Sequence, residues 1–546
     1  MIFFLLVFYI LYNPDSMPLL KYKILREREV LKVKQGILRN GVKDTAVTNY
    51  SNVRVNSVTT NVQNEEQIAV NNLNALNAVA VWRDFRLGYR QVGIGYTFDG
   101  GQTWHDTLAY DTPYEWDSDP VVVSDELGNF YITVLSLPSS EDYTAIYMLK
   151  STDGGLTWNS YEVIDVGEFE DKEWIAIDKT LSSPYHGNIY IAWTRFWYGW
   201  WNEGIHFTRS TDGGNTWSSP IQISTSTSCQ WPVVTVDHLG NVYVAWVNYG
   251  EGKIEMVKST NGGVSFSYPS TITYLNFDGY TYINPNLLVF AYPAITCDIS
   301  PLSPYRGNLY VVYIDSSGSS LMDVYFTKST NGGLTWSSPI RLNDDPYNNP
   351  VDQFHPWIDV DQNGTITVVF YDRRNDPSGN LLMDVYITKS TDGGQTWTPN
   401  ERVTSVSSDP SAKGGLIGEY IGLDVYYGKP FIIWTDTREG SQDAYFGTDT
   451  TFSHVAEKVP KVKKKFVSLS AISKNDVLVK IISPELLNKR AYIEIFDIKG
   501  KKVFEKEINS LRKINLLKIP YLKTGFYFAR LRVENKVFNF KICFVK

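Results

Sequence analysis

The sequence is poor in cysteine, histidine and long apolar runs, and each shortage argues against a class of site. The three cysteines among 546 residues, Cys229, Cys297 and Cys543, have no metal-ligand spacing. They favour buried inert thiols over a disulfide framework. Six scattered histidines argue against a dedicated zinc site. The apolar run at residues 2–12 is too short to cross a bilayer, which takes about twenty residues. We therefore expect no metal, no cofactor and no stable transmembrane span.

Basic charge is scarce over most of the chain and concentrated at its end. Residues 1–457 carry 29 Lys and Arg against 52 Asp and Glu, whereas residues 458–546 carry 22 against 7. A nucleic-acid footprint needs a basic face, so the acidic main body argues against nucleic acid as a partner. The change of charge also marks a domain boundary, with a Lys-rich linker at residues 456–466.

The first residues fit the apolar core of a secretory signal. No Lys or Arg precedes residues 2–12, and no clear small-residue cleavage site follows them. We favour a signal peptide in residues 1–20 and a linker or pro-segment in residues 21–48. The alternative is an apolar N-terminal strand.

An octet repeated along the chain is the strongest pattern present. Residues 210–217 read Ser-Thr-Asp-Gly-Gly-Asn-Thr-Trp, and the Asp or Asn of six copies stands at positions 99, 153, 212, 261, 331 and 392. The spacings of 49 to 70 residues indicate stacked supersecondary units. The Asp accepts backbone hydrogen bonds and the Gly pair supplies positive φ, so each octet predicts a tight turn. Its role is structural.

Each unit reads as a four-stranded meander, of which the cleanest covers residues 355–361, 365–371, 384–389 and 396–403. Second strands recur seven times, at 78–84, 130–136, 189–195, 242–248, 309–315, 366–372 and 431–436. We therefore predict an all-β fold with a seven-bladed β-propeller of four-stranded antiparallel blades at residues 49–455.

The seventh unit lacks a fourth strand, and the missing piece lies near the N-terminus. Val53-Arg54-Val55-Asn56 resembles Ile340-Arg341-Leu342-Asn343, the fourth strand of the fifth unit. We predict that residues 52–57 pair beside residues 443–447 and close the ring, which removes its free sheet edges.

Residues 467–546 form a small, basic, β-sandwich-like domain by their alternating pattern. A strand followed by Asp497-Ile498-Lys499-Gly500-Lys501, and later Leu522-Lys523-Thr524-Gly525-Phe526-Tyr527, resembles the sorting domain of the type IX secretion system (T9SS). The resemblance implies export, a secreted or cell-surface location, and the secretion machinery as a partner.

Chemistry is expected on the face opposite the octets, where second strands end and first strands begin. Carboxylates there suit acid/base work and arginines suit carboxylate recognition. The candidate catalytic residues are Glu173, Asp119 and Glu419. The candidate substrate-binding residues are Arg83, Arg86, Arg195, Arg373, Arg374, Arg438, Trp116, Trp231, His355 and Tyr420. For each of these residues, the alternative is a blade-to-blade salt bridge or a core position.

The octets resemble the Asp-box, or bacterial neuraminidase repeat (BNR repeat), of sialidases and related glycoside hydrolases, over about residues 53–450. That resemblance implies an arginine triad gripping a sugar carboxylate, a Tyr nucleophile activated by Glu, and an Asp acid/base. Arg86, Arg374 and Arg438 are the best-placed arginines for the triad. The sequence departs from the family in lacking an Arg-Ile-Pro motif and in having seven predicted blades where sialidases have six.

The sequence is compatible with two main functions and a weaker third one. The first is an exported, sialidase-like, glycan-directed protein with a glycan or glycoconjugate as partner, acting as a glycoside hydrolase if it is an enzyme. The second is a non-catalytic surface or secreted propeller that binds carbohydrate or protein. A purely structural envelope component is a third, weaker reading.

Overall fold

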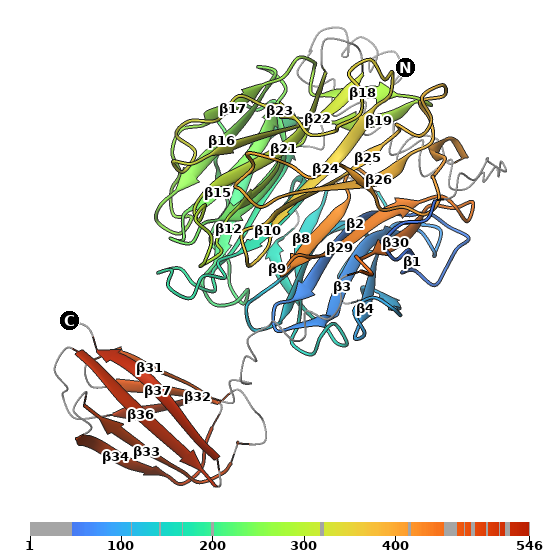
Figure 1. Cartoon of the computed structure of the whole chain (residues 1–546). Coiled ribbons are helices and arrows are strands. Elements are labelled where there is room, and N and C mark those ends of the chain that lie inside the picture. Colours follow the sequence, from blue (N-terminus) through green and yellow to red (C-terminus); the bar gives the residue numbers. More distant parts are fainter. Residues whose placement is uncertain are drawn as a thin grey trace. The chain divides into compact units, whose positions relative to one another are not determined.

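The computed structural model describes two parts of the chain. These are residues 46–451, except 111, 141–142, 166, 198–200, 317–320 and 413–416, and residues 467–544, except 474–475, 482–485, 487, 498–500, 513, 519–524 and 535. They belong to two compact units, residues 1–453 and 454–546 (Figure 1). The predicted signal peptide, most of the predicted pro-segment and the predicted Lys-rich linker lie outside the described residues.

The larger unit is all-β, with seven four-stranded antiparallel sheets within the described residues 46–451. In chain order they consist of β2 (Gln63–Asn71), β3 (Asn74–Asp84), β4 (Gln91–Thr97) and β5 (His105–Leu108); β6 (Trp116–Ser124), β7 (Phe130–Leu137), β8 (Ala145–Ser151) and β9 (Asn159–Ile164); β10 (Phe169–Ile177), β11 (Ile189–Trp197), β12 (Trp201–Ser210) and β13 (Ile221–Gln222); β14 (Cys229–Val236), β15 (Val242–Asn248), β16 (Lys253–Ser259) and β17 (Ser270–Tyr274); β20 (Ala294–Cys297), β21 (Leu309–Ser316), β22 (Met322–Ser329) and β23 (Ile340–Arg341); β24 (Gln353–Val360), β25 (Ile366–Asp372), β26 (Asp384–Ser390) and β27 (Glu401–Arg402); and β28 (Gly422–Tyr426), β29 (Lys429–Asp436), β30 (Asp443–Gly447) and β1 (Val53–Arg54).

Two further small elements lie among the described residues of this unit. The hairpin of β18 (Tyr280–Ile283) and β19 (Leu287–Phe290) is inserted between the fourth and fifth sheets, and a short 3₁₀ helix spans Pro410–Ala412.

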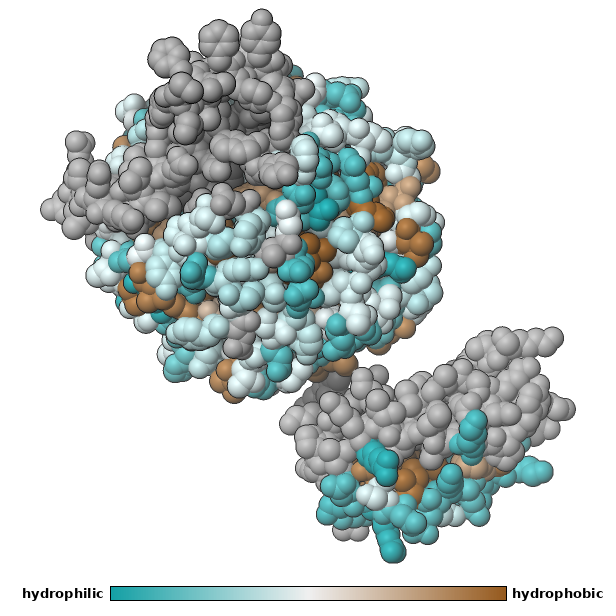
Figure 2. Space-filling model, turned by 180° about the vertical axis from the view of Figure 1, so that it is seen from behind, coloured by the Kyte–Doolittle hydropathy of each residue, from teal (hydrophilic) through white to brown (hydrophobic). Residues whose placement is uncertain are grey.

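On the side seen in Figure 2, hydrophobic residues lie in small separate patches among hydrophilic ones, as expected for a surface in contact with water.

The first strands of the seven sheets form an inner ring. Each contacts the first strand of the next sheet, and β28 of the last sheet contacts β2 of the first. Strand β1 supplies the outer strand of the seventh sheet, with Val53 opposite Phe446 and Arg54 opposite Tyr445. This confirms the pairing that the sequence predicts.

The octets fold as tight turns because their side chains bond the turn backbone. In the copy at residues 210–217, Asp212 Oδ1 accepts hydrogen bonds from Ser210 Oγ at 2.8 Å and from the Thr216 amide at 2.9 Å. Gly213 and Gly214 have φ of 76° and 93°, which glycine adopts without strain. The octets follow third strands, so they lie at the opposite end of the sheets from the second-strand ends.

The core lies between adjacent sheets and is built on the second strands. These are rich in β-branched and aromatic residues, which fit a pleated, buried surface. Trp82, Trp193, Trp246 and Trp434 each come from a different second strand and are fully buried.

The smaller unit contains two antiparallel sheets in its described residues. One has the order β31 (Val467–Ser473), β32 (Asp476–Ile481) and β35 (Ile514–Lys518). The other has the order β34 (Lys502–Ile508), β33 (Ala491–Phe496), β36 (Gly525–Val533) and β37 (Lys536–Phe544). Ile493, Ile495 and Leu531 are fully buried in it.

Candidate functional site

Five of the inner strands carry a bulge that turns one side chain toward the neighbouring sheets. The register of β2, β6, β10, β14 and β24 shifts at this point. The residue in each bulge has a positive φ: 60° at Glu65, 53° at Asp119, 52° at Lys172, 66° at Trp231 and 47° at His355. Few non-glycine residues adopt such angles, and bulges re-aim side chains. The bulges thus bring together residues that are far apart in sequence. They lie toward the end of the sheets where second strands end, which we call the mouth face; the other end is the octet face.

Lys172 joins carboxylates from three other sheets or their flanks. Its Nζ lies 2.9 Å from Asp119 Oδ2 and 3.6 Å from Glu65 Oε2, and it also pairs with Glu419 Oε2. All four side chains are buried. Burial alone would lower the pKa of Lys172, but the ion pairs raise it well above its ordinary value. Lys172 is therefore the positive centre of the cluster.

Glu65 lies between two cations. Besides Lys172, it pairs with Arg83, whose Nη1 lies 3.2 Å from Glu65 Oε1 and whose Nε donates to Asn64 Oδ1 at 2.9 Å. Burial raises the pKa of Glu65 to about 8, although Arg83 and Lys172 act to lower it. The desolvation penalty outweighs the attraction of both cations, so the charged form of the Glu65 carboxyl is disfavoured relative to its neutral form.

Glu173 follows Lys172 and has a different environment. Among the described residues, no other residue hydrogen-bonds either of its carboxyl oxygens. Burial raises the pKa of Glu173 well above its ordinary value, and nearby Asp119 raises it further. A carboxyl group that favours its neutral form beside a cation-paired carboxylate is the relation that acid/base catalysis uses.

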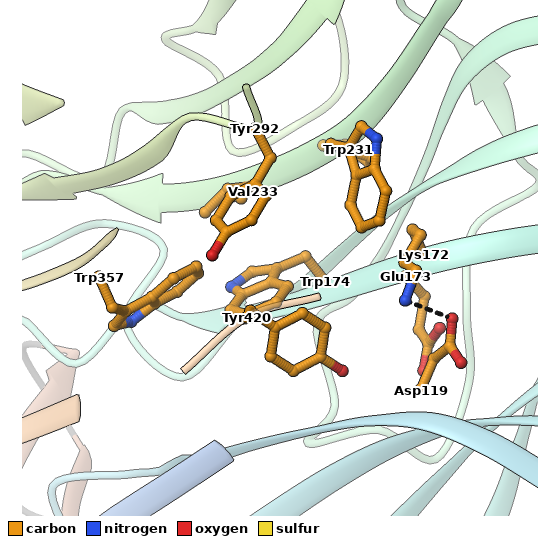
Figure 3. A pocket seen from close by; sticks show the side chains of 10 residues that line it. Asp119, Lys172, Glu173, Trp174, Trp231, Val233, Tyr292, Trp357 and Tyr420 are labelled. Carbon is orange, nitrogen blue, oxygen red and sulfur yellow. Dashed lines mark ion pairs between the residues drawn. The ribbon is translucent and has the colours of Figure 1, made fainter. Parts of the chain in front are cut away.

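A small cavity is lined by Asp119, Lys172 and Glu173 of this polar cluster and by an aromatic wall, which consists of Trp174, Trp231, Tyr292, Trp357 and Tyr420 (Figure 3). Its volume is about 20 Å³, and Pro232 and Val233 complete its lining. Trp174 and Trp357 lie with ring centres 4.7 Å apart. Trp231 donates to Tyr249 Oη at 2.7 Å and packs on Phe290 of the inserted hairpin at 4.6 Å. A cavity of this size holds about one water and no sugar ring.

The Lys172 ammonium also faces this wall, 5.0 Å from the ring centre of Trp231 and 5.3 Å from that of Tyr420. Cation–π attraction adds to the ion pairs in such a dry site. The aromatic wall and the acidic cluster are therefore joined through one ammonium group.

His355 is buried among aromatic rings rather than beside an acid. Its ring centre lies 6.1 Å from that of Tyr292 and 6.2 Å from that of Tyr371. Neither ring nitrogen has a hydrogen-bond partner among the described residues. Burial lowers the pKa of His355 to about 3, with Lys172 and Arg373 adding to the shift. This imidazole is neutral across the physiological range.

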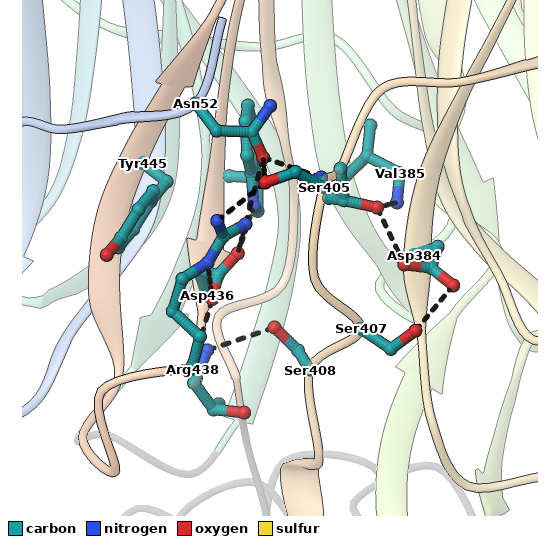
Figure 4. Close-up of polar contacts among 12 residues, drawn as sticks. Asn52, Asp384, Val385, Ser405, Ser407, Ser408, Asp436, Arg438 and Tyr445 are labelled. Atoms are coloured by element: carbon teal, nitrogen blue, oxygen red, sulfur yellow. Dashed lines mark hydrogen bonds and ion pairs between the residues drawn. The ribbon is translucent and has the colours of Figure 1, made fainter. Parts of the chain in front are cut away.

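Three of the candidate arginines share one local motif, Asp-x-Arg, at the end of a second strand. In each, the Arg Nη2 lies 2.7 Å from the carboxylate two residues earlier: Arg86 and Asp84, Arg374 and Asp372, Arg438 and Asp436. Arg438 also donates to Asn52 Oδ1 at 2.9 Å and to Ser405 Oγ at 3.0 Å (Figure 4). It thus ties the ring-closing strand to the loop after β27. A role for these arginines in substrate binding stays a prediction.

Arg195, Arg373 and Trp116 also have partners within the protein. Arg195 Nη2 lies 2.5 Å from Glu170 Oε1. Arg373 donates to the Asn380 carbonyl at 2.8 Å and lies 3.7 Å from Asp352. Trp116 lies under the guanidinium of Arg90 at 5.3 Å.

The structure brings together about half of the residues that the sequence singles out. Glu173, Asp119, Glu419, Arg83, Trp231 and Tyr420 meet at the cluster or its cavity, and His355 lies next to Tyr292 in the aromatic wall. Arg86, Arg195, Arg373, Arg374, Arg438 and Trp116 do not line the cavity.

Sequence reasoning missed Lys172, Trp174, Tyr292 and Trp357. A signal for one of them exists, because a residue followed by Pro recurs at the start of first strands. Asp119-Pro120, Trp231-Pro232 and His355-Pro356 are all of this kind. Tyr292-Pro293 is the fourth example, so aligning these dipeptides would have identified Tyr292.

Among the described residues, Glu65, Asp119 and Glu419 are the group with a geometry that could hold a metal ion. Oxygens from the three carboxylates lie within 4.8 Å of one another. The Lys172 ammonium already lies among them and supplies the positive charge that a metal would bring.

Comparisons with known proteins identify the end of the chain. Residues 474–545 match the family model described as a secretion system C-terminal sorting domain. No curated protein matches the sequence significantly.

Solved structures are similar only at low identity. They include an α-L-arabinofuranosidase of Fusarium graminearum in complex with arabinobiose, at 12% identity, with 73% of this chain and 97% of that chain covered and a TM-score of 0.42. The intramolecular trans-sialidase from Ruminococcus gnavus has 12% identity, coverage of 72% and 95%, and a TM-score of 0.39. A mutant of Trypanosoma rangeli sialidase has 10% identity, coverage of 80% and 84%, and a TM-score of 0.38.

Within the described residues, no helix has the length and apolar character that crossing a membrane requires. The sorting domain defines where the protein acts. The chain ends in a secretion system C-terminal sorting domain, and it is a secreted or cell-surface protein.

Proposed function

We propose that the larger unit is a seven-bladed β-propeller that binds glycans at its mouth face and does not cleave them. The seven four-stranded sheets, the contacts between successive inner strands and the pairing of β1 with β30 support the blade number. Each sheet is then one blade, and the bulged inner strands line the central axis.

The observation that carries the non-catalytic role is the closure of the carboxylate cluster. Glycoside hydrolysis needs two carboxyl groups facing a cleft wide enough for a sugar and a water. Here Asp119 and Glu419 are bound to Lys172, and Glu173 lines a cavity of about 20 Å³. At the centre of the ring these carboxyl groups are neutralised within the protein, because a buried carboxylate requires a cation or a proton.

Exposed aromatic side chains support glycan binding at the mouth face. Large exposed hydrophobic residues there are mainly aromatic, whereas those of the octet face are mainly leucines. The mouth face carries Tyr110, Trp197, Tyr274, Tyr282 and Tyr347; the octet face carries Leu73, Leu127, Leu156, Leu181, Leu239, Leu302 and Leu334. Aromatic rings combine a flat apolar surface with a polar tip, which suits the stacking of sugar rings.

A glycan array with the purified full chain tests this proposal. Trp197→Ala and Tyr282→Ala should each weaken binding about tenfold, the effect of losing one stacking contact of about 1.4 kcal/mol. Leu181→Ala and Leu302→Ala on the octet face are matched controls and should leave binding unchanged. Binding of a protein but of no glycan would overturn the proposal, as would equal loss in all four variants.

One observation favours a second candidate, a glycoside hydrolase. Glu173 favours its neutral form, as a general acid requires, and Asp119 beside it is ion-paired. No other described residue hydrogen-bonds the carboxyl oxygens of Glu173. Turnover of fluorogenic sialosides or of a wider glycoside panel, abolished by Glu173→Gln, would establish this candidate. Absence of turnover in the unmodified protein supports the non-catalytic role.

A further inference from the structure

The fourth octet departs from the repeat in a coordinated way. The third and fifth octets end Trp217-Ser218-Ser219-Pro220 and Trp336-Ser337-Ser338-Pro339, whereas the fourth ends Phe266-Ser267-Tyr268-Pro269. The indole is reduced to a phenyl ring, and a tyrosine replaces a serine two residues later. The phenyl ring keeps the structural contact, since Phe266 packs edge-on against Phe207 at 4.7 Å as Trp397 does against Phe326 at 4.9 Å.

A cavity of about 310 Å³ lies at this departure, which we call the flank pocket. One wall is formed by residues 221–225, which begin with the outer strand β13 of the third sheet. The other wall is formed by residues 264–269 of the fourth octet and its continuation. Phe266 lines the cavity, and its phenyl ring is smaller than the indole of the other octets. The volume falls at the lower end of small-molecule sites.

The lining of the flank pocket has no charge. None of its eleven residues is Asp, Glu, Lys, Arg or His, in a chain in which 20% of residues are charged. Tyr268 is 87% exposed, so its ring is a free platform at the rim. An anionic ligand would find no cation here, and a cationic ligand would find no carboxylate.

Polar groups are available around this platform. The Gln222 side-chain amide and the Thr225 hydroxyl are exposed and make no hydrogen bond within the part of the chain that the structure describes. Ser265 Oγ accepts from Asn261 Nδ2 at 2.9 Å, which leaves its own proton to donate. An aromatic face with an amide and hydroxyls around it is complementary to a hydroxylated ring with apolar C–H faces.

We propose that the flank pocket binds one or two rings of an uncharged carbohydrate. The sugar stacks on Tyr268, and its hydroxyls pair with Gln222, Thr225 and Ser265. The inference rests on the proposed glycan-binding function for its ligand class, but the pocket is at the outer edge of the sheets, away from the mouth face. It gives the protein a second contact with a neutral glycan.

The repeat itself supplies two variants to test the pocket. Phe266→Trp refills it with the residue that the other five octets carry, and Tyr268→Ser restores the residue of the third and fifth octets. Other octets carry both of these residues at the same positions, so the melting temperature of each variant should equal that of the unmodified protein. Leu334→Ser, which removes a similarly exposed apolar side chain from the octet face, is the matched control.

Saturation-transfer NMR of the full chain with galactose, mannose, arabinose, N-acetylglucosamine, lactose and N-acetylneuraminic acid provides the readout. We expect saturation of at least one neutral sugar, about a tenfold loss of affinity in Phe266→Trp and Tyr268→Ser, and no loss in Leu334→Ser. The flank pocket is overturned if both variants bind neutral sugars as the unmodified protein does, or if only the acidic sugar binds. Trp197→Ala, measured in parallel, separates the two proposals. If only Trp197→Ala loses affinity for sugars, the mouth site is supported and the flank pocket is overturned. If only Phe266→Trp and Tyr268→Ser lose affinity, the flank pocket is supported and the mouth site is overturned.

Discussion

The larger unit uses carboxylates in two opposite ways, at the octet turns and at the centre of the ring. The octet aspartates are exposed or half-buried and accept hydrogen bonds from their own turn, and the side-chain and backbone bonds from Thr216 lower the pKa of Asp212 to about 2. The central carboxylates are buried, and burial raises the pKa of Glu65 to about 8. The same chemical group thus keeps its negative charge through nearby donors in one place, and in the other it needs a buried cation or a proton. Solvent access, more than residue type, decides which role an acidic residue can take.

The largest expected effect comes from removing the central cation. Lys172→Met leaves Glu65, Asp119 and Glu419 buried without their shared ammonium, which typically costs about 3–5 kcal/mol of unfolding free energy. Urea denaturation at pH 7 measures this loss. The loss should shrink as the pH falls, because burial raises the pKa of Glu65 and of Glu419, and a protonated carboxyl needs no cation.

Lys150→Met is the matched control, since Lys150 is only half-buried, and its Nζ donates to the Gly213 carbonyl at 3.0 Å and faces the ring of Tyr131 at 4.9 Å. It should cost about 1 kcal/mol or less. Equal stability of Lys172→Met and the unmodified protein would show that the central carboxyls are neutral and need no cation.

A second prediction concerns the alkaline side of the stability profile. The folded-state pKa of Glu65, about 8, lies above its ordinary value of 4.5. Its stabilising contribution is therefore complete below about pH 4.5 and is lost as the pH rises toward 8. Glu65→Gln should flatten the fall in melting temperature between pH 5 and pH 8. Glu251→Gln, at an exposed carboxylate, should keep the original slope; an unchanged slope in Glu65→Gln would remove Glu65 as its source.

The smallest effects are expected at the octets. Asp212→Ala removes acceptors for Ser210 and Thr216 and should cost about 1 kcal/mol, since exposure limits the loss. Asp212→Asn should cost a few tenths, because Asn331 keeps the corresponding bonds, accepting from the Thr335 amide at 3.0 Å.

The acid side of the profile provides a further check of the octets. The folded-state pKa of Asp212 lies below its ordinary value of 3.8, so its contribution is present above that pH and is lost as the pH falls toward 2. Asp212→Asn should remove this acid dependence. A large loss of stability in Asp212→Asn at neutral pH would mean that the charge matters more than the turn geometry.

The sequence predicts the repeated framework well and the central site only in part. The octets and second strands depend on local rules, such as Gly-Gly turns and β-branched runs, and those rules are visible without the fold. The ring-closing pair of Val53 and Phe446 was predictable because the seventh unit lacks a fourth strand and residues 53–56 resemble the fourth strand of the fifth unit.

The site depends on bulges, which place one extra residue in a strand and leave little trace in hydrophobic alternation. The sequence could therefore identify Glu173 as a candidate but not Lys172 beside it, whose importance comes from three carboxylates far away in sequence. In the same way, the Asp-x-Arg motifs are visible in the sequence, but their partners across neighbouring strands, such as Asn52 for Arg438, are not.

The pairing of β1 with β30 also sets an order of events during folding. Val53 and Phe446 are separated by almost the whole of the larger unit, so the ring cannot close until its last sheet has been synthesised. Contacts between residues so distant in the chain are formed slowly, because the entropy of closing the loop must be lost first. Until then, the edge of β30 is open to other strands, and the newly made chain remains vulnerable to aggregation during the interval before export is complete.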